Sequence, residues 1–174
     1  DRNRILELLA RNEPLNTILD HVARMIEHQC PDLRCSILLV KENQLTPAAG
    51  APVPAETLAK LQIPECTWQG ATGLSYRELL PGPASGSNWS VPILSGSGNI
   101  LGAFVFSSSV KRKPADAELE VISKAGRLAA IAVEQRQLTE KLAHQAHHDP
   151  LTGLPNRHLF EEKLNQALAE ARSS

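Results

Sequence analysis

The chain has 174 residues and a formal net charge of −1, enough for one domain of ordinary size with an extension. No basic stripe interleaved with aromatic residues is present, which argues against nucleic-acid binding, and no apolar run reaches the ~18–20 residues of a membrane span. The three cysteines lack metal-site spacing and indicate reduced thiols in a cytoplasmic protein, and no cofactor is predicted. The first residue is Asp1 and no signal-peptide pattern follows, so we expect a part of a longer protein.

Two helices are predicted at the start of the chain. Apolar residues recur at helical spacing over residues 2–10 and again from Leu15 towards Pro31. Between the two, Asn12 is the expected N-cap residue, and Pro14 is expected in the first turn, where a helix tolerates proline.

Two β-hairpins are predicted next, because short β-prone runs flank polar or glycine-containing turns. The first joins residues 36–40 to 45–49, and the second joins 89–94 to 100–106. Between them, a short helix is predicted at 55–61, whereas residues 63–88 show no periodicity. A loop of that length inside a compact domain is usually functional or mobile.

A long helix is predicted from about Ala115 to His148. Within it, alternating steps of three and four residues form a short heptad seam with the apolar members Leu128, Ile131, Leu138 and Leu142. The seam predicts a homodimer formed through this helix.

The sequence after the long helix, Asp149-Pro-Leu-Thr-Gly-Leu-Pro-Asn-Arg157, reads as a helix stop, a turn with two prolines and a new helix start that Asn156 can cap. It resembles the opening of a GGDEF domain, the diguanylate cyclase module of bacterial signalling. The turn that names this module does not occur in the chain. The resemblance implies that Asp149 is structural and that no residue of this chain is catalytic.

The region before this turn resembles a GAF domain over Asn3 to about Gln137. The resemblance rests on five stretches in their order along the chain, namely Ile5 to Leu19, Cys35 to Leu39, Trp89 to Ile93, Ile100 to Phe104, and Ala129 to Ala132. It implies an α+β fold, an antiparallel sheet with helices packed on it, followed by a long C-terminal signalling helix. We expect a sensory domain at 1–137, a linker at 138–148 and a truncated GGDEF start at 149–174. Residues 63–88 are fewer than the family usually has between its hairpins.

A GAF resemblance implies a small-molecule pocket between one face of the sheet and the middle segment. The candidate lining residues are Trp68, Tyr76, Trp89 and Cys66. Amphipathic rings can stack on a planar ligand and donate a hydrogen bond. A core position is the favoured interpretation of Trp89, whereas Trp68 and Tyr76 stay open between pocket and core.

The sequence contains few residues that would indicate a particular ligand. The Asn-Lys-Xaa-Phe-Asp-Glu signature of cyclic-nucleotide GAF domains is absent, and no cysteine is followed by the histidine typical of a bilin site. His144, His147 and His148 have helical spacing, but we expect no metal at an exposed helix end without groups to orient the ligands.

The predicted function is a regulatory domain that senses an unknown small molecule, dimerises, and controls an attached diguanylate cyclase or cyclic di-GMP phosphodiesterase. Two alternatives remain open. One is a dimerisation and relay module without a ligand. The other is a thiol enzyme similar to the GAF domains that reduce free methionine sulfoxide, with Cys66 as the reactive thiol.

Overall fold

The computed structural model describes residues 2–42, 44–55, 58, 77–79, 86–147, 149, 152, 154, 156 and 160. Its elements in chain order are α1 (Arg2–Ala10), α2 (Leu15–Gln29), β1 (Leu33–Lys41), β2 (Gln44–Gly50), β3 (Arg77–Leu79), β4 (Ser87–Leu94), β5 (Ile100–Ser108) and α4 (Asp116–His147). The chain divides into two compact units, Asp1–Glu134 and Gln135–Ser174.

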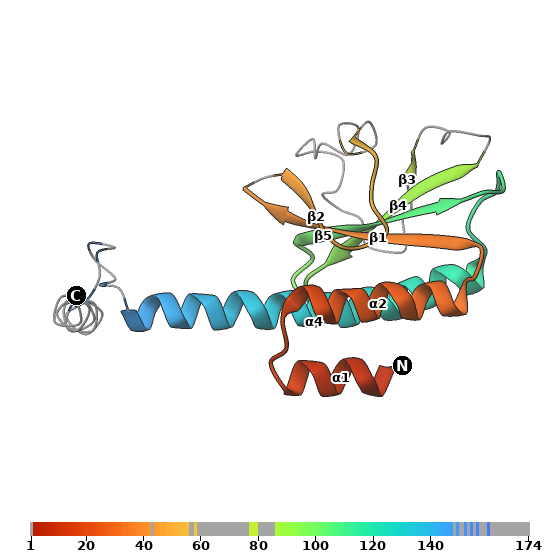
Figure 1. The fold of residues 1–174 in the computed structure, drawn as a ribbon. Coiled ribbons are helices and arrows are strands. Elements are labelled where there is room, and N and C mark those ends of the chain that lie inside the picture. The colour runs from red at the N-terminus through yellow and green to blue at the C-terminus, as the bar shows by residue number, and fades with distance from the viewer. Residues whose placement is uncertain are drawn as a thin grey trace, which may run out of the picture. The chain divides into compact units, whose positions relative to one another are not determined.

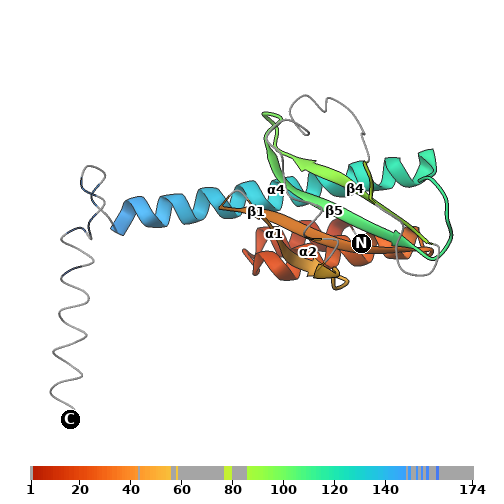
Figure 2. The same ribbon diagram turned by 90° about the horizontal axis from the view of Figure 1, so that it is seen from above.

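The described strands of the first unit form one antiparallel sheet in the order β2-β1-β5-β4-β3. Helices α2 and α4 lie against one face of this sheet, and α1 lies beyond them, away from the strands (Figures 1 and 2). This arrangement confirms the predicted α+β class. We call the opposite side of the sheet, turned away from α2 and α4, the distal face.

The helix-side core is aliphatic with a small aromatic centre. Successive strand residues point to opposite faces, so Ile37 and Leu39 of β1 face the helices together with Phe104 of β5. Helix α2 contributes six buried residues and α1 three, and all of them join the same cluster. Burying such side chains is the main source of stability in a domain of this size.

Both predicted hairpins are confirmed. The β4–β5 turn is closed by the Gly98 amide donating to the Ser95 carbonyl at 3.0 Å, and Gly98 has a φ of 84° that glycine adopts without strain. β1 starts at Leu33, earlier than predicted. The short β3 lies inside the stretch where no element was predicted, and it pairs with β4.

The predicted N-cap of α2 is wrong. Asn12 has a φ of 54° and donates its backbone N–H to the Leu9 carbonyl, so it ends α1 instead of starting α2. Pro14 occupies the N-cap position, and no side chain caps the helix there. Proline suits this place because it has no N–H to leave unpaired.

In the second unit, the described residues of the Asp149 turn close onto the end of α4. The Asp149 carboxylate accepts the backbone N–H of Thr152 at 2.9 Å and its hydroxyl at 3.0 Å. The Asn156 side chain donates to the Ala146 carbonyl at 2.7 Å, and its backbone N–H donates to the His147 carbonyl. The predicted structural role of Asp149 fits this geometry. Of the helices described, none combines the length and hydropathy needed to cross a bilayer.

Candidate ligand-binding site

The distal face carries small apolar side chains and buried hydroxyls. Ser36 of β1, Val105 of β5 and Ser90 of β4 are register partners across three neighbouring strands. Leu38 and Ala103 form the next pair on this face and are 0% and 1% exposed. Such a surface suits a small ligand, since pockets combine apolar walls with a few polar groups that orient what binds.

Part of the distal face is covered by apolar residues that follow β2. Val53 and Leu58 pack against the cluster of Leu38 and Val105, together with Leu45. Leu58 donates its backbone N–H to the Pro54 carbonyl at 3.1 Å, which agrees with the short helix predicted there. These contacts lie over β1 and β5.

The two buried serines of the distal face differ in their hydrogen bonds. The Ser36 hydroxyl donates to the Ala51 carbonyl at 2.7 Å. Ser90 is 0% exposed, and its hydroxyl oxygen has no hydrogen-bond partner. A buried polar group without a partner costs roughly 1–3 kcal/mol. A ligand bound on this face next to Ser90 would therefore give its hydroxyl the hydrogen bond that it lacks.

Trp89 is removed from the candidate ligand residues. It is 1% exposed and belongs to the helix-side core, with its ring centroid 6.1 Å from that of Phe106. Its register partner Phe106 also faces the helices, so the ring points away from the distal face. The remaining candidates Trp68, Tyr76 and Cys66 lie outside the described residues.

Two of the three thiols lie on the helix side of the sheet. Cys35 is fully buried, and burial followed by the charge of Glu27 raises its pKa well above the usual value of 9.0. Burial likewise raises the pKa of Cys30, with the charge of Glu118 acting in the same direction. Both thiols therefore stay protonated near neutral pH, which makes them poor nucleophiles.

An open cleft of about 290 Å³ lies between α2 and the ends of β1 and β2. Its charged residues are Asp20, Arg24, Glu27 and Arg34, whose formal charges cancel. Asp20 accepts the Gly50 N–H at 3.0 Å, and Glu27 accepts the Cys35 N–H at 2.9 Å. The two carboxylates fasten α2 to the strands, and the neutral lining favours no charged ligand.

The four predicted seam residues of α4 differ in their surroundings. Leu128 is 7% exposed and packs in the core of the first unit, so it is unavailable to a second helix. Ile131, Leu138 and Leu142 are 49%, 58% and 57% exposed. Of the four predicted seam residues, Leu128 is therefore excluded by burial, and Ile131, Leu138 and Leu142 are exposed enough to meet a second helix. Within the described part of the chain, no group of three or more acidic, histidine or cysteine side chains could hold a metal ion.

Comparison with models of known protein families shows which family the chain belongs to. The GAF domain model matches residues 15–135, which is most of the chain. The chain belongs to the GAF domain family. The model of the diguanylate cyclase GGDEF domain matches residues 146–174, so the GAF domain is followed by the start of a GGDEF domain. No complete catalytic domain is matched within the chain.

Two curated proteins share sequence with parts of the chain. The methyl sulfide methyltransferase-associated sensor of Methanosarcina acetivorans is 27% identical over 164 residues, covering 81% of this chain and 16% of that protein. The diguanylate cyclase TpbB of Pseudomonas aeruginosa is 67% identical over 30 residues, covering 17% of this chain and 7% of that protein. The chain thus spans a small part of either relative.

Solved GAF domains have the same fold. The GAF domain of an Acinetobacter phosphoenolpyruvate-protein phosphotransferase aligns with a TM-score of 0.58 at 14% identity, covering 80% of this chain and 94% of that one. The phycoerythrobilin-bound GAF domain of a cyanobacterial phytochrome aligns with a TM-score of 0.58 at 15% identity, covering 79% and 95%. At such identities the likeness establishes the fold alone.

Proposed function

We propose that this GAF domain binds a small molecule on its distal face and thereby controls an attached diguanylate cyclase or cyclic di-GMP phosphodiesterase. The observation that carries the proposal is the Ser90 hydroxyl, fully buried and without a partner. A ligand that accepts or donates a hydrogen bond there recovers free energy that the unliganded fold gives up. The curated relatives named above, a sensor and a diguanylate cyclase, support the two halves of this role.

Helix α4 supplies the route from sensor to output, because it runs from Asp116 to His147 and enters the second unit at Gln135. The exposed Ile131, Leu138 and Leu142 favour dimerisation along this helix. A diguanylate cyclase joins two GTP molecules, so the geometry of a dimer can control its activity. A relay of this kind requires that the ligand binds two states of the domain with different free energy.

The test is a thermal-shift screen of the 174-residue chain with nucleotides, amino acids and common metabolites, with native mass spectrometry alongside. A ligand at 100 times its dissociation constant stabilises the fold by about 2.7 kcal/mol, a shift of roughly 5–10 °C. Ser90→Ala should raise the unliganded melting temperature by a few degrees, since it removes a buried hydroxyl that has no hydrogen-bond partner. It should weaken binding about tenfold and so remove about half of the shift.

Ser36→Ala is the matched control, because it removes a distal-face hydroxyl that is already bonded. We expect it to lower the unliganded stability by about 1 kcal/mol. A screen without any hit, together with a dimer in the mass spectrum, would refute the sensor and favour the dimerisation module without a ligand.

A further inference from the structure

Strand β4 presents consecutive residues to the two sides of the domain. Ser90 lies on the distal face, whereas Trp89 lies in the helix-side core, and both are almost fully buried. Because neighbouring residues in a strand share one rigid peptide unit, a displacement of Ser90 moves Trp89 with it. β4 therefore connects the proposed ligand face to the helix layer.

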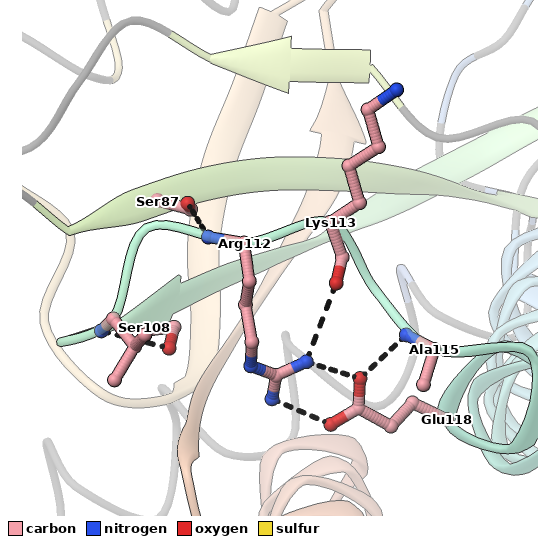
Figure 3. Close-up of polar contacts among 7 residues, drawn as sticks. Ser87, Ser108, Arg112, Lys113, Ala115 and Glu118 are labelled. Carbon is pink, nitrogen blue, oxygen red and sulfur yellow. Dashed lines mark hydrogen bonds and ion pairs between the residues drawn. The ribbon is translucent and has the colours of Figure 1, made fainter.

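Arg112 joins β4 to the segment that leads into α4. Its backbone N–H donates to the Ser87 hydroxyl of β4 at 2.7 Å, and its guanidinium carbon lies 5.9 Å from the centroid of the Trp89 ring. The guanidinium also donates to both carboxylate oxygens of Glu118 at 2.7 Å each (Figure 3). A two-pronged pair of this kind fixes direction as well as distance.

Glu118 lies in the first turn of α4. Its carboxylate accepts the backbone N–H of Ala115 at 2.8 Å, which is half of a capping box, and its charge is favourable at the positive end of the helix (Figure 3). The side chains of Arg112 and Glu118 are only 27% and 15% exposed. One partly buried ion pair thus connects β4 to the start of the helix that continues into the second unit.

A second contact joins the same hairpin to α4 farther along. The backbone N–H of Gly96, in the β4–β5 turn, donates to the Glu134 carboxylate at 3.2 Å. Glu134 is the last residue of the first unit. The hairpin that contains Ser90 therefore holds α4 both near its start and where it leaves the domain.

A coupling element needs two discrete arrangements whose balance a ligand can shift. For Arg112 these two arrangements are the pair with Glu118 and a guanidinium released to solvent, which is within reach because the side chain is 27% exposed. We propose that Arg112 is the connection through which occupancy of the distal face acts on α4, by keeping or releasing Glu118. This inference rests on the proposed function.

The test uses a larger side chain at position 90 to perturb the distal face in place of a ligand. In the 174-residue chain, Ser90→Leu adds bulk to the distal face, and Ser90→Val is the milder variant where Leu prevents folding. Amide hydrogen exchange is measured over residues 116–124, the first turns of α4, with Arg112 intact and in an Arg112→Met background. Arg112→Lys serves as the matched control, because it keeps the charge but loses the two-pronged pair.

With Arg112 intact, the Ser90 substitution should change exchange in the first turns of α4 by about threefold or more, reflecting altered local opening. In the Met and Lys backgrounds, the same substitution should add no further change. Equal changes in all backgrounds would show that the coupling takes another route. Unchanged exchange in a folded Ser90 variant would overturn the proposal as well.

The outcome is independent of any ligand. A screen without a hit, combined with Arg112-dependent exchange, would reject the sensor and keep the connection. A ligand that binds, combined with exchange that is the same with and without Arg112, would support the sensor and reject the connection through Arg112.

Discussion

At the scale of single residues, Gly102 shows how closely the central strands approach each other. A Cβ atom built on Gly102 would lie 2.2 Å from the Leu38 carbonyl oxygen and 3.2 Å from the Leu39 Cα, both of which are backbone atoms that cannot rotate away. Glycine is therefore required at this point of β5.

We predict that Gly102→Ala destabilises the domain by about 1–3 kcal/mol, because β1 and β5 must separate to admit the methyl group. Chemical denaturation monitored by circular dichroism measures the difference. Gly96→Ala is the control on the same hairpin, since nothing lies within 4 Å of the added atom. Equal stabilities of the two variants would contradict the close approach.

Among the strands that the structure describes, β4 is the one in which buried side-chain polar atoms lack hydrogen-bond partners. Besides the Ser90 hydroxyl, the indole N–H of the neighbouring Trp89 is buried without a hydrogen-bond partner. Two such groups cost free energy that a purely structural strand would avoid. A ligand bound as proposed would satisfy the Ser90 hydroxyl, whereas the Trp89 N–H lies on the helix side of the sheet.

At the scale of elements, the start of α4 depends on an ion pair that responds to pH. The hydrogen bond from Arg112 holds the pKa of Glu118 below its usual 4.5, and the Ala115 N–H acts in the same direction. A carboxylate whose pKa is lowered by folding stabilises the protein above its unfolded pKa and loses that contribution as the pH falls through the folded value. This contribution therefore begins to fall near pH 4.5 and is lost once the pH is below the lowered pKa of Glu118.

Glu118→Gln should cost about 1 kcal/mol at pH 7, a modest value because the pair is only partly buried. The difference from wild type should shrink between about pH 5 and pH 3, measured by denaturation at each pH. Glu120→Gln is the control, because its partner Lys124 and Glu120 itself are each 68% exposed. We expect a much smaller effect there, and a Glu118 difference that does not vary with pH would rule out the ion pair as its cause.

Elements with local signals were predictable from the sequence. Both hairpins have β-prone runs around distinct turns, and α4 follows from long helical periodicity. β3 could not be predicted, since three residues show no alternation and their pairing with β4 is set by distant parts of the chain. Asn12 was misassigned because asparagine suits both a helix start and the left-handed conformation that ends α1.

The candidate site was less accessible to sequence reasoning than the fold. Alternation along β4 places Trp89 and Ser90 on opposite faces, but only the packed helices decide which face is the core. Ser90 carries no signal of its own, because its importance lies in being buried without a partner. No pairing of Arg112 with Glu118 was predicted, because it depends on how the chain bends between β5 and α4.

At the scale of the whole molecule, α4 is the only described helix that belongs to both units, since it starts at Asp116 and the boundary follows Glu134. In the function proposed above, a signal from the GAF domain to the GGDEF start passes along this helix. Its first half is committed to the GAF core through residues such as Ile122, Ala125 and Leu128. The apolar residues that remain available for a partner come after that half.

We expect the 174-residue chain to form a dimer through Ile131, Leu138 and Leu142, three large apolar residues that are about half exposed. A helix turns about 100° per residue, which places these positions within about 40° of one another on one side of α4. Leu138→Asp puts a charge in the middle of this stripe and should convert the dimer to a monomer in multi-angle light scattering. Ala143→Asp adds the same charge about 140° away on the same helix and should leave the dimer intact. A wild-type chain that remains monomeric at high concentration, or a dimer that both variants weaken equally, would mean that α4 signals without this interface.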